Sequence, residues 1–285
     1  MENEAEEEIV ITGYPVLDKI LRWFNGSGSP LDDILKLAYI DPLVATVAEE
    51  LRDVLPADEI QKITTSARNI IPAIFRKCFE YGVVNLGAVA YVLATAEHET
   101  DYWRDLEEQE EPGSDPVEYF SDKYANLYGN GDKASRDGYI FRGQGLVHVT
   151  FRDNYGKFMV DTDPSNITNL KNFAQYVEEE YRQRGNSKVA QRLDIATQVL
   201  VQGMQEGYFQ KDKNNPGRGT DYLDKYFIAG KNPTQSDFIA ARIIVNDDAN
   251  APSVAIPTRQ ETKGQKIARR ADTYLQKLKS FAGSR

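Results

Sequence analysis

Residues 86–100 read LGAVAYVLATAEHET, a helical stretch that is apolar on almost every side until its last three residues. Asn85 precedes it, and an asparagine in that position accepts hydrogen bonds from the first free amide groups of a helix. A helix that is apolar all round is buried, so we expect the fold to be built around this one. Its end is acidic: Asp101, Asp105, Glu107, Glu108 and Glu110 follow Glu99.

Glu99 continues an apolar stripe of this helix. Steps of three and then four residues back along the helix reach Ala96, Val92 and Ala88, which share one face with it. Its carboxyl group is therefore expected to face the interior or the wall of a cleft. Apolar surroundings and the negative end of the helix dipole both favour the protonated form, which is the form that a general acid needs.

A second carboxylate is available in the acidic segment. Hydrolysis of a glycosidic bond uses one carboxyl group as an acid and an ionised one that activates water or attacks directly. In a continuous helix Glu108 would lie about 13 Å from Glu99, beyond the roughly 6.5 to 9.5 Å of an inverting pair. A catalytic pair therefore requires the helix to end near Thr100 and the chain to fold back. The competing interpretation is a solvated acidic surface, whereas an H-E-x-x-H zinc site is ruled out because Tyr102 occupies the second histidine position.

Composition and charge narrow the classes of function. The chain has 285 residues and a net charge of -10, which argues against nucleic acid as a partner, since such binding depends on lysine and arginine. The single cysteine, Cys78, lies in an apolar helical pattern and is expected to be buried without an intramolecular disulfide. No apolar run reaches the roughly 18 residues that span a bilayer, and the acidic start MENEAEEEIV does not resemble a secretory signal. We expect a chain made in the cytoplasm, without a signal peptide and without membrane insertion.

The N-terminal part is set apart from the rest at Pro56. A helical pattern at 16–24 stops at the turn-rich NGSGSP of 25–30, and an amphipathic stretch covers 31–54. We therefore predict a helical extension or small domain of unknown role at 1–55 and one main domain at 56–285.

The main domain is expected to be mainly helical. Residues 112–145 are rich in Gly, Asp, Asn and Tyr and are predicted to form a loop with short elements. LVHVTF (146–151) is the best candidate for a strand. Helices are predicted to start at Ala57 and run toward Gly82, and to cover 172–184, 187–206, 236–245 and 265–279.

Four separated stretches together resemble glycoside hydrolase family 19, in the order in which that family has them. They are AYVLATAEHET (90–100), RDGYIFRGQGLVHVTFRDNYGKF (136–158), QVLVQGMQEGYF (198–209) and AARIIVNDD (240–248). The resemblance is strongest to the phage and bacterial endolysin branch, which is related to the plant-type chitinases, and it covers roughly residues 57–279. It implies a mainly α, lysozyme-like domain with a small β element and a carbohydrate cleft, and inverting hydrolysis of a β-1,4-linked amino-sugar polymer.

The resemblance also assigns roles to single residues. Glu99 corresponds to the general acid and Glu108 to the general base, with the neighbouring Glu107 as the alternative base. Thr150 matches the hydroxyl residue that holds the attacking water. Asn154 matches a substrate-binding amide, and Tyr139 and Asn246 match positions in the cleft. None of these roles requires a metal or another cofactor.

Some positions depart from the family pattern. Gln144 stands where G-R-G has arginine, and His148 stands where the family usually has glutamine. His148 either contacts the substrate or supports a strand in the core. Gly143 and Gly145 are expected to form a turn. The aromatic residues Tyr91, Trp103 and Phe141 either stack on sugar rings or belong to the core.

The expected function is therefore a cell-wall glycosidase that acts on peptidoglycan, in the manner of an endolysin, with chitin as the neighbouring substrate. Without a signal peptide, such an enzyme would act at the wall after release or delivery. The alternative is a catalytically reduced saccharide-binding or structural component of a phage tail or contractile injection assembly. In that case the N-terminal region would contact the assembly.

Overall fold

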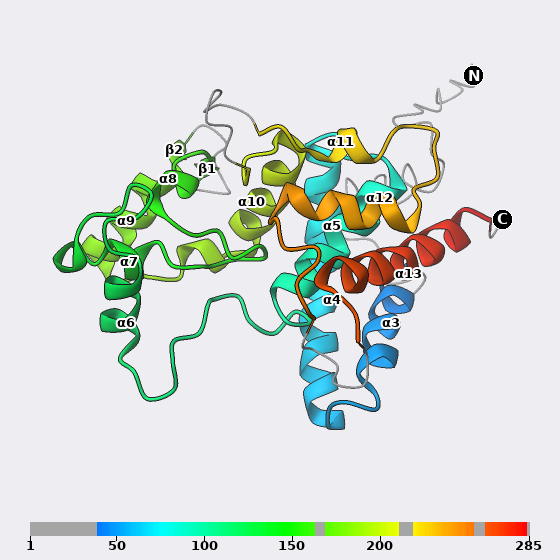
Figure 1. The fold of residues 1–285 in the computed structure, drawn as a ribbon, viewed down its shortest axis with the longest axis horizontal. Coiled ribbons are helices and arrows are strands. Elements are labelled where there is room, and N and C mark those ends of the chain that lie inside the picture. The colour runs from blue at the N-terminus through cyan, green and yellow to red at the C-terminus, as the bar shows by residue number, and fades with distance from the viewer. Residues whose placement is uncertain (1–38, 163–168, 211–218, 254–259, 284–285) are drawn as a thin grey trace, which may run out of the picture.

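Helix α5 (Leu86–Glu99) lies at the centre of a mainly helical fold in the computed structural model, which describes residues 39–162, 169–210, 219–253 and 260–283 (Figure 1). The Asn85 side chain caps it by accepting from the amides of Gly87 (2.8 Å) and Ala88 (3.3 Å). Every residue from Gly87 to Glu97 is buried. The predicted central helix and its cap are confirmed.

One group of helices surrounds α5. Helix α13 (Lys263–Gly283) packs along it, α4 (Ala57–Glu80) and α10 (Leu193–Glu206) contact it, and α3 (Asp41–Leu51) packs on α4 and α13. Helix α12 (Gln235–Ala240) covers α13, next to α11 (Leu223–Tyr226) and the 3-10 helix η4 (Ala241–Ile244). Cys78 belongs to this buried core, as predicted.

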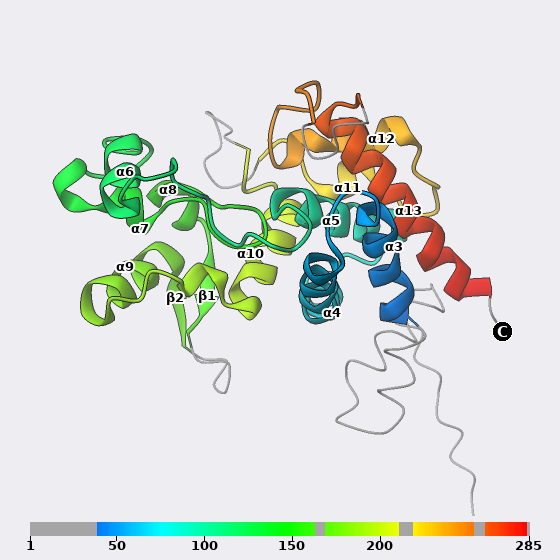
Figure 2. The same ribbon diagram turned by 90° about the horizontal axis from the view of Figure 1, so that it is seen from below.

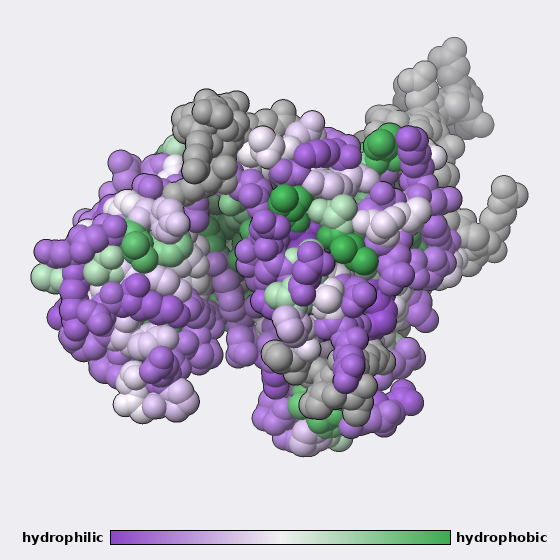
Figure 3. Space-filling model, viewed as in Figure 1, coloured by the Kyte–Doolittle hydropathy of each residue, from purple (hydrophilic) through white to green (hydrophobic). Residues whose placement is uncertain are grey.

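A second group of short elements lies beyond α10 (Figures 1 and 2). Strands β1 (Met159–Asp161) and β2 (Leu170–Asn172) form an antiparallel pair in which Val160 is opposite Lys171. The helices of this group are α6 (Pro116–Lys123), η2 (Lys133–Ser135), α7 (Asp137–Ile140), α8 (Arg152–Tyr155), α9 (Phe173–Arg184) and η3 (Val189–Gln191). The molecular surface is mostly hydrophilic and is hollowed between the two groups (Figure 3). This mainly helical architecture with one small sheet confirms the predicted fold class and is consistent with a lysozyme-like fold.

The strand predicted at 146–151 is wrong. That segment forms a turn, and only an isolated bridge joins Gln144 to Val149. His148 and Phe151 have positive φ angles of 45° and 74°, which a continuous strand excludes. Gly145, at φ 79°, begins the turn, so its lack of a side chain is required there as predicted. Alternating apolar residues suggested a strand, but the turn keeps the segment from extending.

The described residues before Pro56 share the core of the main domain. Leu43, Val47 and Leu51 of α3 are fully or almost fully buried within the same hydrophobic cluster as α5. The helix predicted at 16–24 lies outside the described residues, and a domain boundary near Pro56 stays a prediction. Among the described helices, none is both long and apolar enough to cross a bilayer.

Candidate active site

A cavity of about 480 Å³ lies between the two groups of helices and gathers most of the residues predicted for the site. Those that line it are Glu99, Glu108, His148, Thr150, Asn154 and Asn246. The rest of its wall consists of Tyr124, Val147, Val149, Phe151, Phe209 and Val245. The fold thus brings together side chains from six separated places in the sequence.

The chain reverses direction directly after α5. The Thr100 hydroxyl donates to the carbonyl of Ala96 (2.6 Å) and accepts from the amide of Trp103 (3.0 Å). Three consecutive residues, Asp101 to Trp103, then have positive φ angles, which makes the turn tight. The returning segment pairs with the second group through the bridge between Glu107 and Gln144. The prediction that the helix ends near Thr100 and folds back is confirmed.

Glu99 forms an ion pair with Arg242, a residue that lies far from α5 in the sequence. Its Oε1 accepts from Nη1 of Arg242 at 2.5 Å, and the Arg242 side chain is only 2% exposed. Arg242 also donates through Nε to Asp248 (2.6 Å), which accepts from Lys263 (2.8 Å). Although burial raises the pKa of Asp248, the hydrogen bonds from Arg242 and Lys263 lower it to about 2. The guanidinium of Arg242 thus lies between the carboxyl groups of Glu99 and Asp248.

Glu108 is held by two side chains from the end of α6. Its Oε1 accepts from Lys123 Nζ at 2.7 Å, and the Tyr124 hydroxyl lies 2.7 and 2.8 Å from Oε1 and Oε2. Burial lowers the pKa of Lys123, but its hydrogen bond and attraction to Glu108 raise it overall above the ordinary value. The lysine is thus charged at neutral pH, and the carboxylate is fixed in orientation.

Glu107, the alternative base, does not line the cavity. Its carboxylate accepts from Arg142 (2.6 Å), Lys188 (3.2 Å) and Gln191 (3.0 Å). Although burial raises the pKa of Glu107, the hydrogen bonds and charges of Arg142 and Lys188 lower it overall. These contacts give Glu107 a position in the scaffold behind the cavity wall.

Hydrogen bonds within residues 148–154 orient the polar side chains of this part of the cavity wall. Thr150 donates its hydroxyl to the carbonyl of His148 (2.8 Å), and Asn154 donates to the carbonyl of Thr150 (2.8 Å). The Thr150 oxygen can therefore still accept a hydrogen bond. Nε2 of His148 lies 3.0 Å from the carbonyl oxygen of Asp105. His148 thus lines the cavity from a turn, not from a strand.

Other predicted positions lie away from the cavity. The Tyr139 hydroxyl contacts Ser187 (3.3 Å) and its ring packs against Tyr181, so Tyr139 does not join the site. Tyr91, Trp103 and Phe141 are at most 1% exposed, which makes the core interpretation right and the stacking interpretation wrong. Nothing in the local sequence pattern indicates the partners Arg242, Asp248, Lys123 and Tyr124, although the first two lie in AARIIVNDD.

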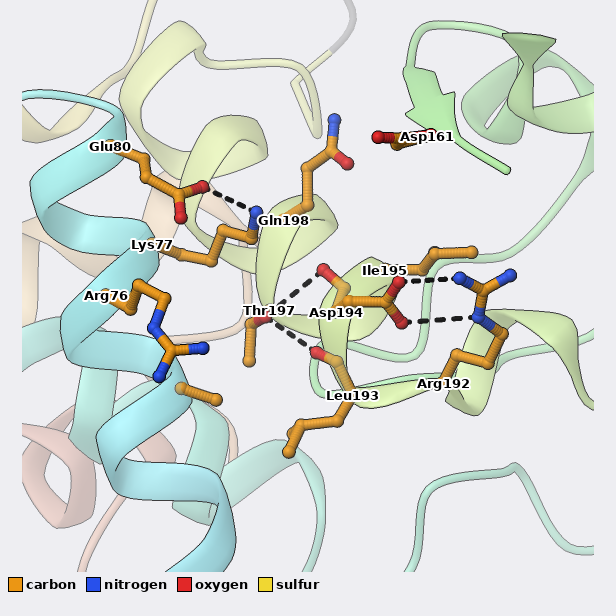
Figure 4. A pocket seen from close by; sticks show the side chains of 11 residues that line it. Arg76, Lys77, Glu80, Asp161, Arg192, Leu193, Asp194, Ile195, Thr197 and Gln198 are labelled. Carbon is orange, nitrogen blue, oxygen red and sulfur yellow. Dashed lines mark hydrogen bonds and ion pairs between the residues drawn. The ribbon is translucent and has the colours of Figure 1, made fainter. Parts of the chain in front are cut away.

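A larger cavity of about 730 Å³ lies between α4, α10 and β1, and two ion pairs lie within its lining (Figure 4). Lys77 bonds to Glu80 (2.5 Å), and Arg192 bonds to Asp194 (2.6 Å). None of the predicted site residues lines this cavity. Within the described ranges, no group of three or more His, Cys, Asp or Glu residues is arranged to hold a metal ion. The smaller cavity is therefore the better candidate active site.

His98, which precedes Glu99, makes stability depend on pH. Burial lowers its pKa from 6.5 to about 4. Between these two values the unfolded chain binds a proton that the folded protein does not, so falling pH destabilises the fold by about 3 kcal/mol through this residue. Urea unfolding is measured for wild type and His98→Gln at a series of pH values. As the pH falls from 6.5 to about 4, the free energy of unfolding of the wild type should decrease by about 3 kcal/mol more than that of His98→Gln. Lys62→Met, at an exposed lysine on α4, is the control and should keep the wild-type slope. Equal slopes for wild type and His98→Gln would contradict the prediction.

Comparison with known proteins gives one short similarity. A glycosyl hydrolase family 19 domain-containing protein of Haemophilus influenzae is 54% identical to this chain over 35 residues, which cover 12% of the chain and 18% of that protein. No protein-family model matches the chain, and no solved structure matches it. The short match points toward family 19 and toward glycoside hydrolysis.

Proposed function

We propose that this protein is an inverting glycosidase that hydrolyses β-1,4 linkages of an amino-sugar polymer, with bacterial peptidoglycan as the substrate and chitin as the neighbouring one. The observation that carries the proposal is that Glu99 and Glu108 line one cavity, because the helix that carries Glu99 ends immediately after it and the chain folds back. The short similarity to a family 19 protein supports the same class of reaction.

In the proposed reaction Glu99 is the proton donor. Its Oε1 is bonded to Arg242, and its Oε2 has no hydrogen-bond partner among the described residues, which leaves Oε2 to carry the proton. This proton passes to the glycosidic oxygen as the bond between that oxygen and the anomeric carbon breaks. Arg242 then stabilises the carboxylate that remains.

Glu108 acts on the opposite side of the sugar. Thr150 orients a water molecule, whose oxygen attacks the anomeric carbon while a proton passes to the Glu108 carboxylate. Lys123 and Tyr124 hold that carboxylate in place through bonds of 2.7 to 2.8 Å. Attack from the face opposite the leaving group inverts the configuration of the anomeric carbon.

Product analysis tests this function and identifies the polymer. The protein is incubated separately with purified peptidoglycan and with chitin oligomers, and the products are analysed by mass spectrometry. We expect new reducing ends from peptidoglycan, with the α-anomer appearing first in proton NMR. A Glu108→Gln sample is the control and should release about 10²–10⁴-fold less product. If neither polymer yields new reducing ends, the proposed function is wrong.

A catalytically reduced saccharide-binding component is the second candidate. It is favoured by the ion pairs that neutralise both carboxylates, Glu99 with Arg242 and Glu108 with Lys123. In that case wild type and Glu108→Gln would bind the polymer equally and release no product. Delivery to the wall by a phage tail or injection assembly belongs to the same proposal, and the location of a tagged copy before and after cell lysis tests it.

A further inference from the structure

A third cavity, of about 450 Å³, opens near the end of α5 and has no lining residue in common with the candidate active site. Its wall consists of Leu51, Val54, Leu55, His98, Asp101, Tyr102, Arg104, Ser253, Lys263 and Lys266. The proposed hydrolysis uses none of these residues. Some polar groups of this wall nevertheless make no hydrogen bond within the described part of the chain.

Lys266 is a buried lysine without an acceptor. It is 3% exposed, and none of the hydrogen bonds and ion pairs found among the described residues involves its ammonium group. Nζ instead lies 4.4 Å from the centre of the Tyr102 ring. Burial lowers the pKa of Lys266. An ammonium group has three N–H donors, and leaving them unpaired in the interior is unfavourable.

The carboxylates nearest to Lys266 are already bonded to arginines. Glu97 accepts from Arg270 at 2.7 and 2.9 Å. Glu50 and Glu261 both accept from Arg269, at 2.8 to 3.2 Å. Because Arg269 and Arg270 already bind these three carboxylates, none of them is bonded to Lys266, which lines the cavity.

Two more polar groups on the same wall lack partners. The Tyr102 hydroxyl and Nδ1 of His98 are buried and make no hydrogen bond to any residue that the structure describes. Tyr102 is only 2% exposed. Because the pKa of His98 is lowered to about 4, its imidazole is neutral at pH 7 and carries one N–H group. Lys266 lines the hollow, and the two buried atoms belong to residues that line it as well, which together indicate a site for an acceptor-bearing ligand.

The remaining wall indicates the charge and shape of that ligand. Lys263 is bonded to Asp248 (2.8 Å), and Arg104 is bonded to Asp101, so each of these cations already has a carboxylate. Lys266 is therefore the wall cation without a carboxylate partner in the described part of the chain, which matches one negative charge. The side chains of Leu51, Val54 and Leu55 supply an apolar surface beside it.

We propose that this cavity binds a small carboxylate ligand with an aliphatic group, whose oxygens accept from Lys266 and Tyr102 while the aliphatic group contacts Leu51, Val54 and Leu55. A carboxylate offers two acceptor oxygens and a single charge, which fits one free ammonium and one free hydroxyl. The proposal does not depend on glycosidase activity, because the two cavities are separate.

Histidine NMR of the full-length protein tests this site. The chain has only two histidines, and His98 lines the proposed site whereas His148 lines the candidate active site. Titration with N-acetylleucine should shift the imidazole resonances of His98 in a saturable way, with a dissociation constant of about 1 mM, and leave those of His148 in place. N-acetylleucinamide differs only in its uncharged end and should bind at least about tenfold more weakly.

Three variants separate a specific site from a general effect. Lys266→Met keeps the length and removes the charge, and it should weaken binding about 10- to 100-fold. Tyr102→Phe removes one hydroxyl and should weaken binding about two- to tenfold. Lys62→Met, at an exposed lysine on α4, is the matched control and should bind like wild type. Wild-type affinity in both Lys266→Met and Tyr102→Phe would overturn the proposal. Equal binding of the amide, or tighter binding of inorganic phosphate, would overturn it as well.

Discussion

Replacing Glu99 with glutamine is expected to lower turnover of the cleaved polymer by about 10²–10⁴-fold, because an amide is too weak an acid to protonate the departing oxygen. Glutamine is close to glutamate in size, and it can still contact Arg242 through its carbonyl oxygen. Binding of the polymer and the unfolding midpoint should therefore change little. Release of reducing ends, measured at equal concentrations of folded protein, gives the comparison.

The control for this variant is Glu111→Gln, which removes a carboxylate from an exposed position in the same acidic segment. It should retain wild-type turnover. If Glu99→Gln is as active as Glu111→Gln, then Glu99 is not the acid and the cavity has another role.

Replacing Arg270 with methionine is expected to lower the free energy of unfolding by about 3–5 kcal/mol. Arg270 is 3% exposed and makes two hydrogen bonds to Glu97, which is 1% exposed and also accepts from Tyr274. Arg270 further donates to the carbonyl of Thr46 at 3.2 Å. Without the guanidinium, a buried carboxylate would lose its countercharge where α3, α5 and α13 meet. Urea unfolding followed by circular dichroism measures the loss.

A double variant separates this cause from lost packing. Glu97→Gln together with Arg270→Met removes both charges, so its stability should be higher than that of Arg270→Met alone. Lys62→Met, on the solvent-exposed face of α4, should unfold like wild type. If the double variant is no more stable than the single one, the uncompensated charge is not the main cause.

The central helix of the fold could be predicted from the local sequence. The burial of α5, its asparagine cap and its end near Thr100 all follow from interactions within about four residues, which a pattern contains. LVHVTF failed as a strand for the opposite reason, since a strand exists only if a partner lies beside it. The turn at Gly145 removes that possibility, and the antiparallel pair of β1 and β2 forms further along the chain.

Sequence reasoning found most of the residues that line the candidate site, but it did not find the partners that bind their carboxylates. The family resemblance assigned roles to Glu99, Glu108, Thr150 and Asn154, and the structure gathers these side chains at one cavity. Their roles stay predictions. Arg242 reaches Glu99 across 143 positions of sequence, and Tyr124 reaches Glu108 across 16. Such partners depend on how helices are placed in space, and periodicity within one segment carries no information about that.

The packing of α3 has a practical consequence for producing shorter versions of this protein. Leu43, Val47 and Leu51 lie at 0 to 1% exposure against α4 and α13, and Glu50 holds Arg269 from the same helix. A recombinant fragment that starts at Ala57 would expose the apolar surface of α4 and α13 that α3 covers, and Arg269 would keep only Glu261 as a carboxylate partner. Such a fragment should stick to other molecules and precipitate, and its inactivity would reveal nothing about the chemistry of the two glutamates.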